Sequence, residues 1–487
     1  MTRNNTVIRI VGESGEGIVS TGEILSRALL QTGKHIMTFR TYPAEIKGGQ
    51  CLFQVRFSNE KLHTAGDAID ILVCFDKKSY TASIDHLPHS LLIYNSDDTH
   101  IEEQLNAFGL PLTTIARQEL DSLQSKNMVV LGALCYLLGL DIKNIMNVMQ
   151  RWFAGKDKML IDKNEIAVNA GRQYCADKKF PGIQKIPVQA FDESVILSGN
   201  QALVLAALAA GCRFFFFFSI TPASNILEHM VAELPKFGGI GLQAEDEIAA
   251  LGACIGASYA GTKAMTATSG PGLSLMHEMI GMAGMMEIPV VIVDAQRAGP
   301  STGMPTKMEQ SDLFAAIHGS HGEAPRVVVA PGSVEECYSI TMHAFNISEF
   351  LRVPVIILTD VALAQRTATL PTMLFDHADI KSRRLLDQND KNFAPYALDG
   401  VPVNPMVLPG MKERMHVVTG LEHDEQGMPN YTPEMHAAMT QKRYAKLEHV
   451  FELYAGYEEF QSPNQDVGII SWGSTYGPVL EALTKMD

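Results

Sequence analysis

Hydrophobic positions in the first part of the chain alternate between short strand-like runs and longer runs with helical spacing. Five short apolar runs, rich in β-branched and aromatic residues, predict strands. They cover residues 7–11, 36–39, 51–57, 71–75 and 91–94. Apolar residues recur at helical spacing over residues 18–30, and further helical patterns fill residues 127–178. Because strands alternate with helices, we expect an α/β domain over residues 1–180.

A short linker containing Pro181, Gly182 and Pro187 marks the boundary to a second α/β pattern, which we place at residues 190–385. Six short apolar runs in this part are each followed by a helical pattern. They cover residues 213–218, 240–243, 263–267, 290–294, 326–329 and 355–359. Repeated units of this kind predict a doubly wound parallel sheet. The predicted fold class is therefore α/β, with several domains that include doubly wound parallel sheets.

The rest of the chain predicts no complete domain. Residues 386–460 begin with a stretch rich in Pro, Asn, Asp and Gly, which favours an extended linker, and continue as a polar helix. Residues 467–472 have a strand pattern, and residues 478–486 have a helical one. Since one strand and one helix cannot form a sheet alone, we expect residues 461–487 to begin a further domain that is incomplete in this sequence.

Charge and cysteine usage narrow the classes of function. The net charge of −15 argues against a nucleic-acid partner, because such proteins usually carry a basic surface. The seven cysteines form no CxxC-like cluster, so we expect buried thiols in a reducing compartment and no metal site in this chain. The N-terminus lacks a signal-peptide pattern, and the longest apolar stretch, residues 129–140, is too short to span a bilayer. We therefore expect a cytoplasmic protein with no membrane partner.

Two segments of the second domain carry candidate chemistry. The first, Gln243-Ala-Glu-Asp-Glu247, lies where a strand gives way to a helix of small and apolar residues. The helix dipole favours a carboxylate there, although acidic residues are common at helix starts for that reason alone. The second, Thr268-Ser-Gly-Pro-Gly272, joins a strand to a helix at the sheet edge where ligands usually bind. Its glycines let the backbone approach a cofactor, although an ordinary tight turn would also use them.

Together, these segments resemble the pyrimidine-binding domain of thiamine-diphosphate enzymes, and the family's glutamate falls on Glu247. In that family the glutamate bonds the aminopyrimidine ring nitrogen and stabilises the imino tautomer, whose nitrogen removes the thiazolium proton. The resemblance therefore implies thiamine diphosphate as cofactor and Glu247 as a catalytic residue. The further cofactor contacts that it implies are Ile220, Thr268, Ser269, Gly270 and Pro271.

A third segment, residues 297–303, reads Arg-Ala-Gly-Pro-Ser-Thr-Gly and closely resembles a motif of the catalytic subunit of 2-oxoacid:ferredoxin oxidoreductases. The arginine of that motif holds the substrate carboxylate through charge-assisted hydrogen bonds. Residues 218–222 resemble the family's Tyr-Pro-Ile-Thr-Pro, but Phe218 and Ser219 replace its Tyr and Pro. The substrate-binding residues that the resemblance implies are Arg297, Thr221, Ser301 and Thr302, the first two with a catalytic role as well.

The first domain resembles the gamma component of the same family, fused here ahead of the catalytic part. The resemblance rests on Gly12-Glu-Ser-Gly-Glu-Gly17, whose spacing is not that of a dinucleotide-binding loop, and on residues 41–49. Lys47 in the second segment is a candidate for contacting substrate or coenzyme A, and a structural turn is the alternative. Residues 420–425 resemble the family's inter-domain segment and carry no assigned chemistry. Residues 461–487 would begin a domain like the C-terminal domain of transketolase.

The resemblance implies that a 2-oxoacid is oxidatively decarboxylated with coenzyme A to an acyl-CoA and CO2, and that ferredoxin is reduced. The same reaction could run in reverse and fix CO2. The order of the fused parts favours 2-oxoglutarate, and pyruvate or a broad range of 2-oxoacids is the alternative. A second alternative is a non-oxidative thiamine carboligase, but the fused first domain argues against it. A third alternative is a noncatalytic assembly subunit, but Glu247 and Arg297 argue against it.

The sequence also predicts a partner subunit. It contains no Gly-Asp-Gly-type motif for the magnesium and diphosphate side of the cofactor, and no cysteine cluster for electron transfer. The resemblance implies that a beta subunit supplies the diphosphate site, Mg2+ and a four-iron, four-sulfur (4Fe-4S) cluster. It further implies a dimer of heterodimers that passes electrons to ferredoxin.

Overall fold

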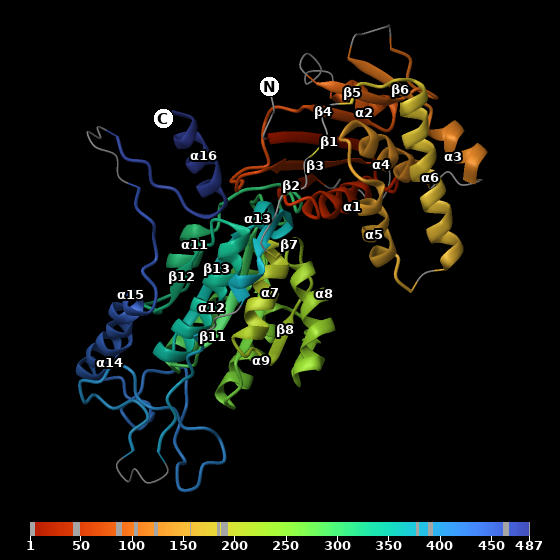
Figure 1. Ribbon diagram of the computed structural model, residues 1–487. Helices are drawn as coiled ribbons and strands as arrows, with labels where there is room; N and C mark the ends of the chain where they lie inside the picture. The colour runs from red at the N-terminus through yellow and green to blue at the C-terminus, as the bar shows by residue number, and fades with distance from the viewer. Residues whose placement is uncertain are drawn as a thin grey trace. The chain divides into compact units, whose positions relative to one another are not determined.

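The structure, a computed structural model of the chain, contains two compact units (Figure 1). The first comprises Met1–Leu197 and Arg366–Leu374, and the second comprises Ser198–Gln365 and Phe375–Asp487. The structure describes residues 5–41, 49–83, 90–101, 106–120, 125–155, 157–182, 186, 193–375, 379–387, 393–460 and 467–486.

An eight-stranded mixed sheet with the order β6-β5-β4-β1-β3-β2-β14-β7 forms the first unit. The pairs β1–β4, β4–β5 and β5–β6 are parallel. The pairs β1–β3, β3–β2 and β2–β14 are antiparallel. The five strands predicted for this region are confirmed, and β6, β7 and β14 are additional. The strands are β1 (Asn5–Glu13), β2 (His35–Thr41), β3 (Gln50–Ser58), β4 (Ile71–Cys74), β5 (Leu91–Asn95), β6 (Ala107–Leu110), β7 (Ser194–Ser198) and β14 (Thr367–Pro371).

The main core of the first unit lies between this sheet and its helices, where Ile10, Leu25 and Leu131 are fully buried. Helices α4 and α6 pack with their backbones in contact, because a Cβ atom at Gly132 would lie only 1.9 Å from the carbonyl oxygen of Val168. Glycine at this crossing therefore permits the close approach. The helices are α1 (Ile18–Leu30), α2 (Lys77–Ala82), α3 (Leu112–Leu120), α4 (Lys126–Leu137), α5 (Ile142–Trp152) and α6 (Lys158–Asp177).

Strand β14 reaches the first sheet from a distant part of the sequence. The backbone N–H of Thr367 donates to the Thr38 hydroxyl (3.0 Å), and the N–H of Ile36 donates to the Thr369 hydroxyl (2.9 Å). Residues 367–371 lie inside the stretch that the sequence pattern assigned to the second domain. That pattern records local periodicity only, so it could not reveal which sheet the strand joins.

The second unit contains a six-stranded sheet with the order β12-β13-β11-β10-β8-β9, and its neighbouring strands are parallel. The predicted doubly wound parallel sheet is therefore confirmed, and all six predicted strands are present. The strands are β8 (Phe214–Phe217), β9 (Ile240–Gln243), β10 (Ala264–Thr268), β11 (Val290–Gln296), β12 (Val327–Val329) and β13 (Pro354–Asp360).

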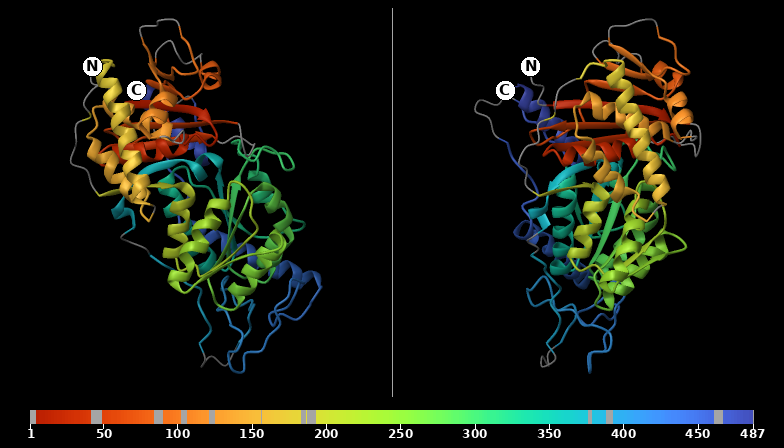
Figure 2. Two further views of the ribbon diagram at one scale, coloured as in Figure 1. Left: turned by 90° about the vertical axis from the view of Figure 1, so that its right-hand side faces the viewer. Right: turned by 45° about the vertical axis from the view of Figure 1, so that its right-hand side comes forward.

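Helices cover both faces of this sheet (Figures 1 and 2). Helices α9, α10 and α11 pack on one face, where Leu251, Met276 and Ile292 share a fully buried core. Helices α7, α8, α12 and α13 belong to the other face. The helices are α7 (Gly199–Ala209), α8 (Ser224–Glu233), α9 (Glu247–Tyr259), α10 (Gly270–Met285), α11 (Leu313–His318), α12 (Val334–Leu351) and α13 (Val361–Gln365).

Beyond residue 375, the described residues of the second unit contain helices but no strand. The linker predicted at residues 386–432 has an irregular backbone wherever it is described, and the predicted helix follows it. The strand predicted at residues 467–472 is wrong: these residues find no strand to pair with, and a strand needs a neighbour. The helices are α14 (Pro433–Ala445), α15 (Val450–Leu453) and α16 (Tyr476–Met486), with a 3-10 helix at Lys446–His449.

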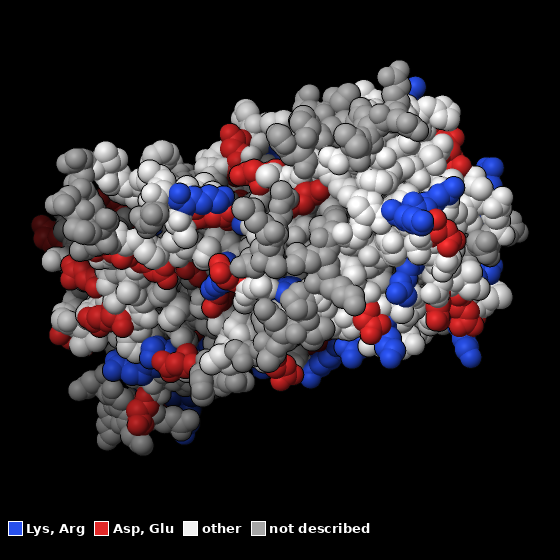
Figure 3. Space-filling view, turned by 45° about the horizontal axis from the view of Figure 1, so that its top comes forward, with Lys and Arg blue, Asp and Glu red and all other residues white. Residues whose placement is uncertain are grey.

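The surface carries charges of both signs despite the net charge of −15. On the face drawn in Figure 3, acidic and basic side chains are interspersed among neutral ones, without a large basic patch. Within the described part of the chain, no helix combines the length and the apolar character needed to cross a membrane.

Candidate cofactor and substrate site

Four parallel strands of the second unit bring the predicted motifs to one edge of the sheet. β9 ends shortly before Glu247, β10 ends at Thr268, β11 ends just before Arg297, and β8 ends shortly before Thr221. The chain passes from β9 at the sheet edge to β10 on the far side of β8, so the strand order changes direction beside β8. Ligands of doubly wound sheets bind at such a point, outside the carboxyl ends of the strands.

Glu247 is the first residue of helix α9 and is only 5% exposed. The preceding residue, Asp246, caps the helix by accepting a hydrogen bond from the backbone N–H of Ala249 at 2.7 Å. This cap fixes the helix start, and with it the position from which the Glu247 side chain extends. A buried carboxylate placed here also benefits from the positive end of the helix dipole.

The Glu247 side chain lies directly against the turn after β10. A Cβ atom at Gly272 would lie 2.6 Å from Oε1 of Glu247 and 2.0 Å from Oγ1 of Thr268. Only glycine leaves room for this approach, so Gly272 sets the distance between the carboxylate and the turn. The sequence alone does not predict this role of Gly272, because it does not reveal which atoms a side chain at that position would displace.

Two buried polar groups lie at this position. Glu247 is 5% exposed, and within the described part of the chain the buried Ser269 hydroxyl has no hydrogen-bond partner. Buried polar groups are normally paired, so such groups indicate that a ligand or water satisfies them. A carboxylate facing a protonated ring nitrogen, and a hydroxyl facing a polar ring, fit the aminopyrimidine of thiamine diphosphate.

The Arg297 side chain joins the two predicted substrate segments. Its Nη1 donates to the carbonyl oxygen of Thr221 at 2.8 Å, and its Nη2 donates to that of Thr302 at 2.9 Å. Arg297 is 7% exposed, and burial lowers its pKa without removing its charge at neutral pH. Within the described residues it makes no ion pair with a carboxylate, and its Nε has no partner. Its positive charge is therefore available to an anionic ligand.

The loop after Arg297 folds back on itself. The backbone N–H of Met304 donates to the carbonyl oxygen of Ala298 at 2.9 Å, and Ser301 and Gly303 adopt left-handed conformations with φ of 59°. A side chain at Gly303 would collide with the Ala298 carbonyl, so glycine is required there. Ser301 and Thr302 are exposed at the tip of this loop, where a ligand could reach their hydroxyls.

The remaining predicted residues fall into three groups. Thr268 and Ser269 are fully buried at the end of β10, and Gly270 and Pro271 form the first turn of α10. Ile220 is half-buried in the loop that precedes Thr221. The structure thus brings these residues to the same edge of the sheet as Glu247. Lys47 lies outside the described residues.

All seven cysteines are buried, as the sequence predicted, and none forms a disulfide bond. Burial raises the pKa of Cys74, Cys175, Cys212 and Cys254 to about 12, so these thiols stay protonated at neutral pH. The described residues contain no cluster of His, Cys, Asp or Glu that could hold a metal ion.

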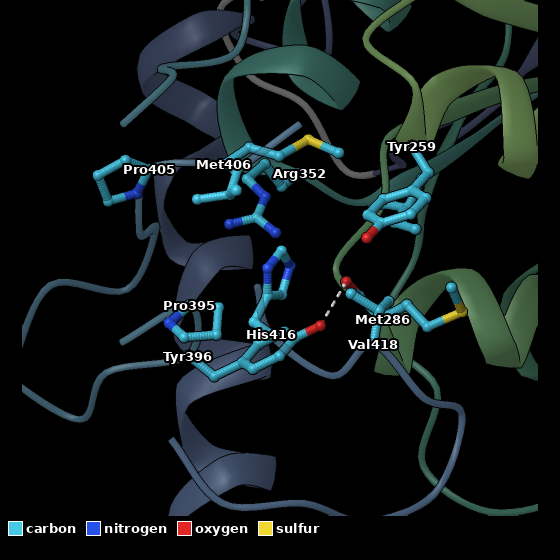
Figure 4. A pocket seen from close by; sticks show the side chains of 11 residues that line it. Tyr259, Met286, Arg352, Pro395, Tyr396, Pro405, Met406, His416 and Val418 are labelled. Carbon is cyan, nitrogen blue, oxygen red and sulfur yellow. Dashed lines mark hydrogen bonds between the residues drawn. The ribbon is translucent and has the colours of Figure 1, made fainter. Parts of the chain in front are cut away.

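A small cavity lies at the opposite edge of the second sheet, where helices end and strands begin (Figure 4). Arg352, Tyr396, His416 and Tyr259 are among its lining residues. Its volume of about 10 Å³ holds roughly one water molecule, so it cannot accept a substrate. The carboxyl edge around Glu247 and Arg297 is therefore the stronger candidate site.

Comparisons with known proteins agree with this fold. Residues 205–442 match the family described as "Pyruvate flavodoxin/ferredoxin oxidoreductase, thiamine diP-bdg", and residues 7–174 match "Pyruvate ferredoxin/flavodoxin oxidoreductase". The second unit is thus a thiamine-diphosphate-binding domain of this type, as predicted.

Relatives extend the match over nearly the whole chain. The 2-oxoglutarate oxidoreductase subunit KorA of Mycobacterium tuberculosis is 32% identical, over 99% of this chain and 80% of that protein. The 2-oxoacid:ferredoxin oxidoreductase subunit alpha of a Sulfolobus species is 30% identical, over 98% and 84%. A solved structure, the 2-oxoglutarate:ferredoxin oxidoreductase from Magnetococcus marinus with 2-oxoglutarate, coenzyme A and succinyl-CoA bound, is 40% identical with a TM-score of 0.94, over 99% and 86%. The chain belongs to the 2-oxoacid:ferredoxin oxidoreductase family.

Proposed function

We propose that this chain is the catalytic subunit of an enzyme that oxidises 2-oxoglutarate. In the overall reaction, 2-oxoglutarate and coenzyme A give succinyl-CoA, CO2 and a proton. The two electrons released by this oxidation reduce ferredoxin. The reverse direction would fix CO2. The substrate choice follows the two relatives that are named for 2-oxoglutarate and that resemble the chain over nearly all its length.

The observation that carries the proposal is the buried Glu247 carboxylate, which lies against Gly272 on the same sheet edge as the Arg297 guanidinium. When bound, thiamine diphosphate supplies the nucleophilic carbon and the electron sink of the reaction. Glu247 would hold a proton at the aminopyrimidine ring nitrogen. Thr268, Ser269, Gly270, Pro271 and Ile220 would line the cofactor ring and exclude water from it.

Arg297 would bind the carboxylate that leaves as CO2. Its guanidinium is already oriented by the carbonyl groups of Thr221 and Thr302, so little conformational freedom is lost when substrate binds. The hydroxyls of Thr221, Ser301 and Thr302 are the neighbouring polar groups that could contact the rest of the 2-oxoacid. We keep Lys47 as a proposed contact to substrate or coenzyme A.

We expect Arg297→Met to raise the KM for 2-oxoglutarate about 100-fold, because a charge-assisted carboxylate contact contributes about 2–3 kcal/mol. Steady-state kinetics with 2-oxoglutarate and pyruvate should show the loss for both acids. Arg213→Met is the matched control, since Arg213 also donates to two backbone carbonyls, at 3.2 and 2.8 Å, but precedes β8 at the opposite edge of the sheet. An unchanged KM in the Arg297 variant would contradict the assignment. A wild-type preference for pyruvate would correct the substrate and leave the reaction class.

The proposal includes a partner subunit. Apolar side chains beside the site are exposed: Ile248, next to Glu247, is 40% exposed, and Leu275, near the start of α10, is 51% exposed. Exposed apolar groups around a binding site indicate an interaction surface. We propose that a beta subunit covers this surface and brings the diphosphate site, Mg2+ and a 4Fe-4S cluster, in a cytoplasmic dimer of heterodimers.

The purified chain supplied with thiamine diphosphate, Mg2+, 2-oxoglutarate and coenzyme A should therefore form no succinyl-CoA. Co-expression with the beta subunit should restore turnover and ferredoxin reduction, together with the brown absorption of the cluster. The matched control is the complex carrying Leu275→Asp, which should assemble poorly because a charge would be buried at the interface. Turnover by the chain alone would refute the shared site and favour a non-oxidative thiamine enzyme.

A further inference from the structure

The loop that carries Arg297 needs firm anchors if the guanidinium is to keep one orientation. We call residues 297–311 the substrate loop, since Arg297, Ser301 and Thr302 lie in it. It begins after the last residue of β11 and ends at Asp312, just before α11. Most of the loop is half-buried or exposed, so packing contributes little to its order. Ordering such a loop costs conformational entropy, so hydrogen bonds have to fix its ends.

One buried side chain holds both ends of the substrate loop. Gln296, the last residue of β11, directly precedes Arg297 and is 0% exposed. Its Oε1 accepts a hydrogen bond from the backbone N–H of Asp312 at 3.0 Å, and its Nε2 donates to the carbonyl oxygen of Thr359 at 3.0 Å. Thr359 belongs to β13, the strand beside β11. Because the Gln296 amide is both an acceptor and a donor, it ties the far end of the loop and its near end to the sheet.

The other bonds of the loop do less to fix it to the sheet. Backbone bonds within residues 298–307 fold the loop on itself, and the N–H of Gly299 donates to Oε2 of Glu309 at 2.9 Å. These bonds shape the loop without attaching it to a strand. A further bond reaches β13, from Nε2 of Gln310 to Oδ2 of Asp360, but it is longer, at 3.3 Å, and only partly buried. The shorter, buried bond of Gln296 to the same strand is weakened less by water, so Gln296 is the stronger anchor.

We propose that Gln296 is a positioning residue for Arg297. Its amide fixes both ends of the substrate loop, so that the Arg297 guanidinium keeps the orientation set by the carbonyls of Thr221 and Thr302. The entropy of ordering the loop is then lost on folding and not on substrate binding, which strengthens the binding of the 2-oxoacid. The proposal deepens the proposed function, on which its kinetic consequences rest.

The kinetic test uses the assembled enzyme with Gln296→Met, which has a similar length and removes both hydrogen bonds. The KM values for 2-oxoglutarate and pyruvate should rise about tenfold and by the same factor, because Arg297 binds the carboxylate that both acids share. The KM for coenzyme A should stay within about twofold of the wild type. A merely structural role would reduce the amount of folded enzyme, and with it the apparent kcat, without changing either KM. An unchanged KM for 2-oxoglutarate in the folded variant would overturn the proposal.

Gln54→Met is the matched control. Gln54 is a strand residue of the first unit that is 2% exposed, and its Nε2 donates to the carbonyl oxygens of Ala65 at 2.8 Å and Gly66 at 2.7 Å. The control makes the same change in a buried amide and should leave the KM for 2-oxoglutarate unaltered. If Gln296→Met does not fold, Gln296→Thr replaces it, because threonine favours a strand but is too short to span the two partner groups. This variant should raise the same KM values, and wild-type values would equally refute the proposal.

A second readout, hydrogen exchange measured on peptides of the assembled enzyme, does not depend on activity. In Gln296→Met, residues 298–312 should exchange at least about tenfold faster than in the wild type, whereas β10 and β13 should keep their protection. Wild-type exchange in this loop would overturn the proposal, whatever the substrate proves to be. If Arg297→Met left the KM unchanged, the proposed function would fail, and faster exchange in the loop would still support Gln296 as its anchor.

Discussion

Glu247→Gln should lower the kcat of the assembled enzyme by at least about 100-fold while leaving its fold intact, because general acid–base relays contribute about 10²–10⁴-fold. The amide has the size of the carboxylate, so it should fit beside Gly272 and Thr268, where the space is tightly limited. It cannot accept a ring proton as a carboxylate does. Stopped-flow and steady-state measurements of succinyl-CoA formation, with circular dichroism as a check of the fold, would give the result.

The matched control for this variant is Glu245→Gln. Glu245 lies two residues earlier, at the same strand-to-helix junction, but its side chain is exposed. The control removes the same charge from nearly the same place and should leave kcat within about twofold of the wild type, as surface substitutions have small effects. Equal activity of both variants would show that Glu247 only decorates the start of a helix.

Much of the second unit could be predicted from the sequence because its strands are short, apolar and separated by helices. The resemblance of three motifs predicts roles for Glu247 and Arg297, and the fold brings both residues to one sheet edge. What the motifs did not reveal is how the site is held together. Arg297 binds the backbone carbonyls of Thr221 and Thr302, and every residue type offers such carbonyls, so this contact leaves no mark in the sequence.

The features that were missed depend on contacts between distant residues. Strand β14 joins the first sheet through Thr367 and Thr369, although its own pattern does not identify the partner. Conversely, residues 467–472 have the apolar pattern of a strand but no neighbouring strand, and pairing decides the conformation of such a segment.

A buried ion cluster around Glu287 stabilises the second unit at the edge of its sheet opposite the site. Glu287 is 1% exposed, and its carboxylate pairs with Lys442 at 2.6 Å and with Lys446. Its carbonyl oxygen accepts from Nε of Arg352 at 3.0 Å. Burial alone would raise the pKa of Glu287, but the charges of Lys446, Lys442 and Arg352 hold it well below its ordinary value. This one carboxylate therefore balances buried cations from the C-terminal helices and from the end of α12.

Glu287→Gln should destabilise the second unit by about 3–5 kcal/mol, because removing one member of a buried ion cluster leaves its partners uncompensated. Urea unfolding followed by circular dichroism would measure the loss. Glu233→Gln is the control, since Glu233 pairs with Lys236 at 2.8 Å on the surface, with both side chains largely exposed, and such pairs contribute about 0–1 kcal/mol.

The double variant Glu287→Gln with Lys446→Met separates charge balance from packing. Removing Lys446 as well takes one uncompensated cation out of the cluster, so the double variant should be more stable than Glu287→Gln alone. If lost packing were the cause instead, the second substitution would add a further loss. Because the cluster and the site lie at opposite edges of the sheet, each variant should retain its kcat below its unfolding transition. A loss of kcat in a fully folded variant would mean that the C-terminal helices also shape the active edge.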